Sequence, residues 1–216
     1  FFSVRWFELN ELKELEALSI GKDSFNMAKS ERSDGSFQIS NCPNLTTIVL
    51  SDYSFYDYHI FELTNLTSLQ SIIVSMRCFV YTPSFSLTNL PQLQSVRIGF
   101  GAFWLSHFVQ FENLPSLQSI RLGQLAFMGD DRDERKLFNT EPYDYQNRLI
   151  MRNLPSLTTI VGSSQNFEYF GYVYLNNIPN IKHIEFYYEC FEYTCFLYSP
   201  KSNSLGAVIK QKSSYV

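Results

Sequence analysis

A 24-residue repeat constrains this chain more than any other feature of its sequence. The segments 89–99 (NLPQLQSVRIG) and 113–123 (NLPSLQSIRLG) differ at only three of eleven positions. The same register runs along the chain, with one apolar marker residue in each unit: Leu9, Ile39, Leu63, Leu87, Phe111, Met151 and Leu175. The steps between markers are 30, 24, 24, 24, 40 and 24, so the seven units carry a 6-residue and a 16-residue insertion. A fixed period of this length is the signature of a stacked repeat protein.

Each unit holds seven apolar columns. Across seven units these columns contain 49 positions, and Gly162 is the one exception. One column is phenylalanine throughout: Phe25, Phe55, Phe79, Phe103, Phe127, Phe167 and Phe191. A single unit cannot bury its apolar side alone, so neighbouring units must stack on it. The step of two from Val96 to Ile98 predicts a short strand, and the preceding spacing of three predicts irregular or helix-like coil.

The pattern therefore predicts a repeat solenoid with one parallel β-sheet of short strands. Mostly coil, with short strand or 3-10 segments, is expected on the convex side. The solenoid is predicted over residues 1–198, with insertions near 27–35 and 128–148. Residues 199–216 are expected to form a C-terminal tail or a partial cap.

An asparagine column precedes the predicted strands of six units: Asn41, Asn65, Asn89, Asn113, Asn153 and Asn177. We expect these side chains to be buried, because amide groups can pair with the backbone groups of stacked turns. Proline follows two positions later in five of these units, where its fixed φ keeps the turn extended.

The stretch L-x-x-L-x-x-I-x-L at residues 114–122 resembles the strand segment of a leucine-rich repeat. The endings Ala102-Phe103 and Ala126-Phe127 resemble the BspA-like repeats of bacteria and protists. The asparagine column departs from the family, because it stands before the strand and not after it. The resemblance implies a curved array that offers a binding surface. It also suggests a secreted or cell-surface effector or adhesin; the alternative is a cytoplasmic scaffold or substrate-recognition subunit.

Composition and motifs exclude several other functions. The net charge of −4 over 216 residues argues against general binding to nucleic acid. No apolar run reaches the roughly 18 residues of a membrane span, so no membrane insertion is expected. His59 and His107 share a column two units apart, roughly 10 Å by strand spacing, which is too far for a shared metal. We find no nucleophile, phosphate-binding or zinc motif, and we expect a monomeric non-enzyme without a cofactor.

Two groups of residues are candidates for binding a protein partner. The 16-residue insertion combines mixed charges with aromatic rings: Asp130, Asp131, Arg132, Asp133, Glu134, Arg135, Lys136, Phe138, Tyr143 and Tyr145. The strand face is mostly Ser, Thr and Gly, except for His183, Glu185, Tyr187 and Tyr188 at its C-terminal end. Mixed charges speed encounter, and buried rings supply affinity.

Tyrosines also concentrate in the expected connections after the strands, including Tyr56, Tyr81, Tyr172, Tyr174 and Tyr198. A carbohydrate-binding surface that uses Tyr and Asn is therefore a further alternative. The spacing also leaves open whether Cys190 and Cys195 form a local disulfide.

Overall fold

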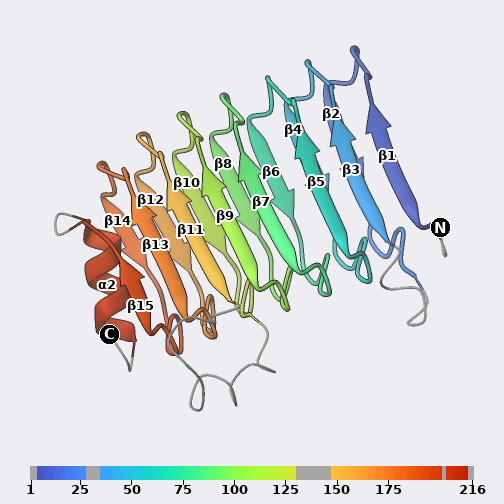
Figure 1. Ribbon diagram of the computed structural model, residues 1–216. Coiled ribbons are helices and arrows are strands. Elements are labelled where there is room, and N and C mark those ends of the chain that lie inside the picture. The colour runs from blue at the N-terminus through green and yellow to red at the C-terminus, as the bar shows by residue number, and fades with distance from the viewer. Residues whose placement is uncertain (1–3, 28–34, 130–146, 201–202, 214–216) are drawn as a thin grey trace.

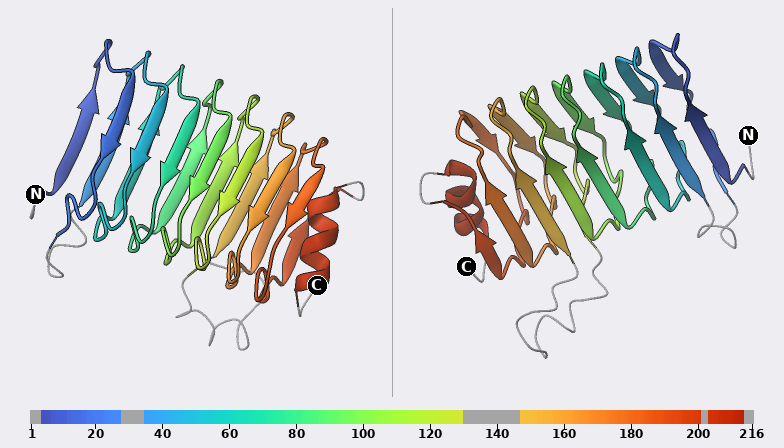
Figure 2. Two further views of the ribbon diagram at one scale, coloured as in Figure 1. Left: turned by 180° about the vertical axis from the view of Figure 1, so that it is seen from behind. Right: turned by 45° about the horizontal axis from the view of Figure 1, so that its top comes forward.

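The computed structural model describes residues 4–27, 35–129, 147–200 and 203–213. In these ranges the chain forms fifteen strands and one helix. Each unit contributes one strand to each of two opposing faces, and the units stack side by side along one axis (Figures 1 and 2). The molecule is thus a β-rich solenoid of parallel strands, as the 24-residue period predicts.

The even-numbered strands form one parallel sheet of seven strands, in the order β14-β12-β10-β8-β6-β4-β2. Their bounds are β2 (Ala17–Ile20), β4 (Thr47–Leu50), β6 (Ser71–Val74), β8 (Ser95–Ile98), β10 (Ser119–Leu122), β12 (Thr159–Gly162) and β14 (His183–Glu185). This sheet contains the strand that the Val96–Ile98 step predicts.

The odd-numbered strands form the opposite face, which the sequence interpretation wrongly assigned mostly to coil. They make two parallel sheets, β1-β3-β5 and β7-β9-β11-β13-β15. Their bounds are β1 (Trp6–Asn10), β3 (Ser36–Ser40), β5 (Ile60–Thr64), β7 (Ser84–Thr88), β9 (Phe108–Glu112), β11 (Arg148–Arg152), β13 (Tyr172–Asn176) and β15 (Phe196–Tyr198). Phe85 and Leu87 show the same step of two as Val96 and Ile98, and both are buried. The alternation therefore creates a strand at both places.

The second layer of strands also explains the shape of the stack. Figures 1 and 2 show a nearly straight array, where the sequence predicted a curved one. Hydrogen-bonded strands lie about 4.8 Å apart, and here that spacing applies on both faces. Neither face is therefore longer than the other along the stack.

The register continues across both insertions. Most neighbouring strands pair with a sequence offset of 24, for example Ser95 with Ser119. Arg148 of β11 pairs with Phe108 of β9, an offset of 40. Ser36 of β3 pairs with Trp6 of β1, an offset of 30. The strand that follows each insertion therefore resumes the same alignment.

The core lies between the two faces, and its centre is the phenylalanine column. From the second unit onward these rings are at most 3% exposed. Phe103 stacks between Phe79 and Phe127, with ring centroids 5.1 and 5.5 Å away, while Phe85 meets it edge-on at 4.7 Å. Gly162, the one gap in the apolar columns, lies against the ring of Phe186, which occupies the space a side chain would take.

A short helix covers the C-terminal end of the stack. Helix α2 (Ser204–Lys212) buries Leu205 and Ile209 against the last units (Figure 1). The side-chain oxygen of Asn203 accepts hydrogen bonds from the backbone N–H groups of Leu205 and Gly206, at 3.0 and 3.3 Å. These bonds satisfy donors that a helix start leaves without intrahelical partners. The sequence predicted a tail or a partial cap for residues 199–216.

Candidate binding surfaces

The ten insertion residues predicted to bind a partner, Asp130 to Tyr145, lie outside the described residues. The structure does describe both ends of the insertion. The backbone N–H of Gly129 donates to the carbonyl of Trp104 at 3.0 Å, and Asn147 is buried and donates to the carbonyl of Tyr169 at 2.9 Å. The described residues on both sides of the insertion are thus hydrogen-bonded to the stack.

The four predicted residues at the C-terminal end of the strand face do lie together. The Tyr187 hydroxyl donates to Glu185 Oε1 at 2.5 Å, and His183 Nε2 lies 3.5 Å from Glu185 Oε2. The hydrogen bond from Tyr187 lowers the pKa of Glu185 and raises that of Tyr187. Tyr188 follows directly and is 78% exposed. The group therefore presents two exposed rings beside a carboxylate held in its ionised form.

A second aromatic surface lies on the opposite face and was not recognised from the sequence. Tyr172 and Tyr174 of β13 stack on Phe196 and Tyr198 of β15, each pair with ring centroids 4.7 Å apart. The guanidinium of Arg148 on β11 lies 5.9 Å from the centre of the Tyr172 ring. The sequence interpretation placed these tyrosines in connections. The sequence does indicate a strand here, because aromatic residues at 172 and 174 are repeated 24 positions later at 196 and 198.

The asparagine column forms a third surface, and the prediction that it is buried was wrong. Asn89 is exposed and has a φ of 57°. All six asparagines of the column have a φ between 52° and 57°. The column turns the corner between the two faces in the left-handed conformation, which Asn tolerates better than most residues. The asparagine side chains therefore lie outside the core.

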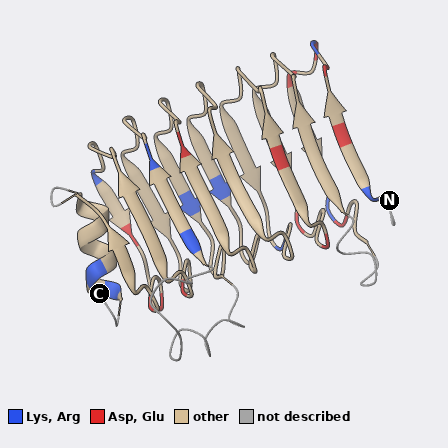
Figure 3. Cartoon of the chain, in the orientation of Figure 1, with Lys and Arg blue, Asp and Glu red and all other residues tan. Residues whose placement is uncertain are grey.

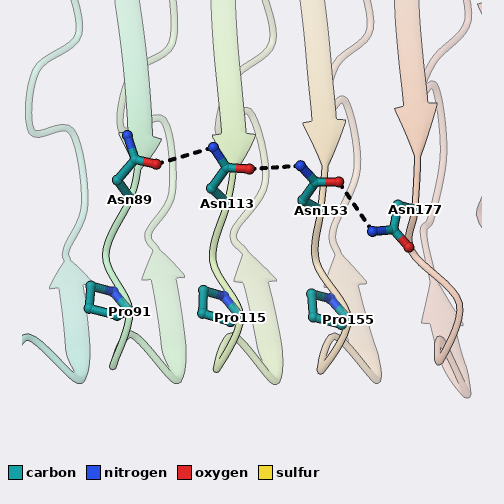
Figure 4. Close-up of a pocket in the computed structure, with 7 residues that line it drawn as sticks. All are labelled: Asn89, Pro91, Asn113, Pro115, Asn153, Pro155 and Asn177. Atoms are coloured by element: carbon teal, nitrogen blue, oxygen red, sulfur yellow. Dashed lines mark hydrogen bonds between the residues drawn. The ribbon is translucent and has the colours of Figure 1, made fainter.

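The asparagines pair with one another along this corner. The last three asparagines of the column each donate from the side-chain amide to the side-chain oxygen of the preceding asparagine: Asn113 to Asn89 at 3.1 Å, Asn153 to Asn113 at 2.7 Å and Asn177 to Asn153 at 3.1 Å (Figure 4). Pro91, Pro115 and Pro155 run parallel to this ladder and complete a groove of about 480 Å³. Because the amides bond to one another, the groove offers mainly apolar proline rings.

The described residues hold few groups with reactive chemistry. The four cysteines are free thiols, so Cys190 and Cys195 are not bonded to each other. No group of three or more His, Cys, Asp or Glu within the described ranges is placed to hold a metal ion. Glu168 is a buried carboxyl whose Oε2 atom has no hydrogen-bond partner, and burial raises its pKa to about 7. Side-chain hydrogen bonds from Tyr169 and Gln165 oppose this increase in pKa.

Comparison with known proteins gives no match. No family model, curated protein or solved structure matches this chain. In the part of the chain that the structure describes, no helix has the length and apolar character needed to cross a membrane.

Proposed function

We propose that this protein is a non-enzymatic binding module that recognises a protein partner through the aromatic C-terminal end of its stack. One observation carries the proposal. Among the described residues, seven large hydrophobic side chains are exposed, and four of them lie at the C-terminal end of the stack: Tyr187 and Tyr188 after β14, and Phe196 and Tyr198 on β15. The other three are Trp6, Leu12 and Ile60 near the opposite end. The middle units bury their large apolar side chains.

The chemistry of this end suits a protein interface. Tyrosine and phenylalanine supply large contact areas, and tyrosine keeps a polar tip for hydrogen bonding. Charged groups lie near the rings: Glu185 and His183 beside Tyr187, and Arg148 beside Tyr172. Lys212 of helix α2 donates to the carbonyl of Tyr187 at 2.6 Å and so ties the exposed rings to the cap. A rim of charges around apolar rings is the usual arrangement of a specific interface.

The insertion belongs to the same proposal. Gly129, the last described residue before the insertion, lies beside Tyr169 and Phe170 of the sixth unit. We propose that its charged residues steer the partner and that the C-terminal rings then supply most of the affinity.

The resemblance to leucine-rich repeats is part of this proposal too. The buried residues Leu114, Leu117, Ile120 and Leu122 fit the resemblance, while the strand on the second face departs from it. A recognition role on a cell surface or in secretion is proposed on this resemblance alone.

The test is a pull-down in which quantitative mass spectrometry compares three variants with the wild-type bait. The first variant, Tyr187→Ala with Tyr188→Ala, removes the rings of one face, and the second, Phe196→Ala with Tyr198→Ala, removes those of the other. Ile60→Ala is the matched control, because Ile60 is an exposed apolar residue (38%) far from the C-terminal end. Partners that depend on the proposed surface should be lost with at least one ring variant and retained with the control. Retention of every specific partner by both ring variants contradicts the proposal.

A fourth variant separates the insertion from the rings. Deleting residues 130–145 joins Gly129 to Gln146 and restores the 24-residue period, since the register resumes at Arg148. The deletion should leave the melting temperature nearly unchanged, because surface loops add little to stability. Loss of the partner only in this variant would assign binding to the insertion.

Carbohydrate binding is a second candidate, favoured by the exposed rings of Phe196 and Tyr198 on the edge strand β15. The two stacked pairs on β13 and β15 have interplanar angles of 7° and 9°, and Asn176 donates from its amide to the Tyr174 hydroxyl at 3.3 Å. The inner faces of each pair lie against each other, so a sugar ring would stack on the outer faces of Phe196 and Tyr198. Glycan-array binding that disappears with Phe196→Ala would favour this function over protein recognition.

A further inference from the structure

Two arginines lie side by side in the middle of the seven-stranded sheet. Arg97 of β8 pairs directly with Arg121 of β10 in the strand register. Both point outward, because the residues before and after each of them are buried. Neighbouring strands are about 4.8 Å apart, so the two guanidinium groups extend from adjacent positions. Figure 3, in which Lys and Arg are blue, shows basic segments near the middle of the stack.

The pair has no counter-charge in the described structure. Its neighbours in the same row are Ile73 on β6 and Val161 on β12. The acid in that row, Glu185, lies two strands from Arg121 and already bonds Tyr187. Like charges directly opposite on adjacent strands are destabilising. The fold therefore carries a repulsion here that the described residues leave uncompensated.

A hollow of about 470 Å³ lies next to the pair. Its lining includes both arginines together with Gly99 and Gly123. A Cβ on Gly99 would lie 2.7 Å from the Ser75 carbonyl carbon, and one on Gly123 would lie 2.6 Å from the Phe100 nitrogen. The close approach of successive turns thus requires glycine at both positions, and no side chain from them can fill the hollow.

We propose that Arg97 and Arg121 bind a tetrahedral oxyanion group, either a phosphate ester or a sulfate ester. A guanidinium presents its N–H donors in a planar fork that matches two oxygens of such a group. Two forks from neighbouring strands can engage opposite edges of one tetrahedral anion, whereas a carboxylate offers only two oxygens in total. Binding the anion would also remove the repulsion between the arginines. This site is independent of the aromatic end of the stack.

The experiment follows the arginine Nε–H signals by NMR while sodium phosphate or sodium sulfate is added at constant ionic strength. Two side-chain signals should shift and saturate in the wild-type protein. Arg97→Gln and Arg121→Gln should each weaken binding about tenfold or more, as expected for loss of charged hydrogen bonds. Arg121→Lys keeps the charge but loses the fork, and it should also weaken binding. Circular dichroism checks that each variant is folded.

Lys182→Gln is the control for general electrostatics, because it removes one exposed positive charge just before β14. It should leave the affinity unchanged. Shifts that do not saturate, or equal losses with Lys182→Gln and Arg121→Gln, overturn the proposal. Titration with O-phosphoserine and galactose 6-sulfate then distinguishes the two sources of the group. Tighter binding of either ester supports the site and identifies the source, and binding of neither overturns it.

Discussion

The side-chain amide of Asn113 donates a hydrogen bond to the side-chain oxygen of Asn89, one unit earlier in the chain, at 3.1 Å. Both residues have positive φ, 54° and 57°, and both lie at the corner between the two faces. One residue type thus meets two demands. It adopts the left-handed conformation that the corner needs, and its amide bonds to the asparagine of the neighbouring unit.

These two roles can be separated at Asn113. Asn113→Gly removes the ladder bonds but permits the positive φ, whereas Asn113→Ala removes the bonds and also strains the corner. We expect the free energy of unfolding to be about 1 kcal/mol lower for the alanine variant than for the glycine variant. Urea denaturation measures the difference. Equal stability of the two variants would mean that the corner conformation contributes little.

Phe103→Ala should lower the free energy of unfolding by about 3–5 kcal/mol, because it opens a cavity between two stacked rings. The side chain is fully buried and contacts Phe79, Phe85 and Phe127. Gln92→Ala, at an exposed position of the same unit, serves as the surface control. A loss no larger than that of the control would contradict the packing described here.

Glu168 should make stability depend on pH. Burial raises its pKa from an ordinary value of 4.5 to about 7, and nearby Glu189 and Glu192 add to this increase. Between these two values the folded chain holds this proton more tightly than the unfolded chain does. The free energy of unfolding should therefore fall as pH rises from about 4.5 to about 7, then stay level.

The check is the melting temperature of wild type and Glu168→Gln at pH 5 and pH 8. The glutamine variant should match wild type at pH 5 and exceed it at pH 8, because the amide never ionises. Parallel melting curves at both pH values would show that Glu168 does not remain protonated in the fold.

Thiol reactivity should follow burial. Cys42, Cys78 and Cys190 are buried, and burial raises the pKa of Cys78 to about 11. Cys195 is half-buried. Because the thiolate is the reactive form, Ellman's reagent should label Cys195 first and the others only after unfolding. Cys195→Ser should abolish the fast phase; a fast phase that persists in this variant identifies another exposed thiol.

The sequence predicted the period, the core columns and the even-numbered strands, because each repeats seven times. It missed the second face, although Phe85 and Leu87 show the same alternation as Val96 and Ile98. It also misplaced the asparagine column. An asparagine that recurs in six of the seven units shows that its position is constrained. The repeat alone does not tell whether the constraint is a positive φ at a corner or a buried amide.

The candidate surfaces were harder to predict. Tyr187 and Tyr188 stood out because the column of Tyr187 is Ser or Gly in every other unit. The platform of Tyr172, Tyr174, Phe196 and Tyr198 depended on recognising β13 and β15 as paired strands. The Arg97–Arg121 pair was visible as a column, but its missing counter-charge and the adjacent hollow required the structure.

The resumed register after the insertion has a practical consequence. The corner after the phenylalanine column carries the extra residues between Gly129 and Asn147. The flanking strands β9 and β11 nevertheless pair in the usual alignment. The same corner also admits the shorter insertion after the first unit. This corner can therefore accept peptides of different length while the repeat scaffold stays unchanged. New binding sequences could be inserted there without redesigning the stack.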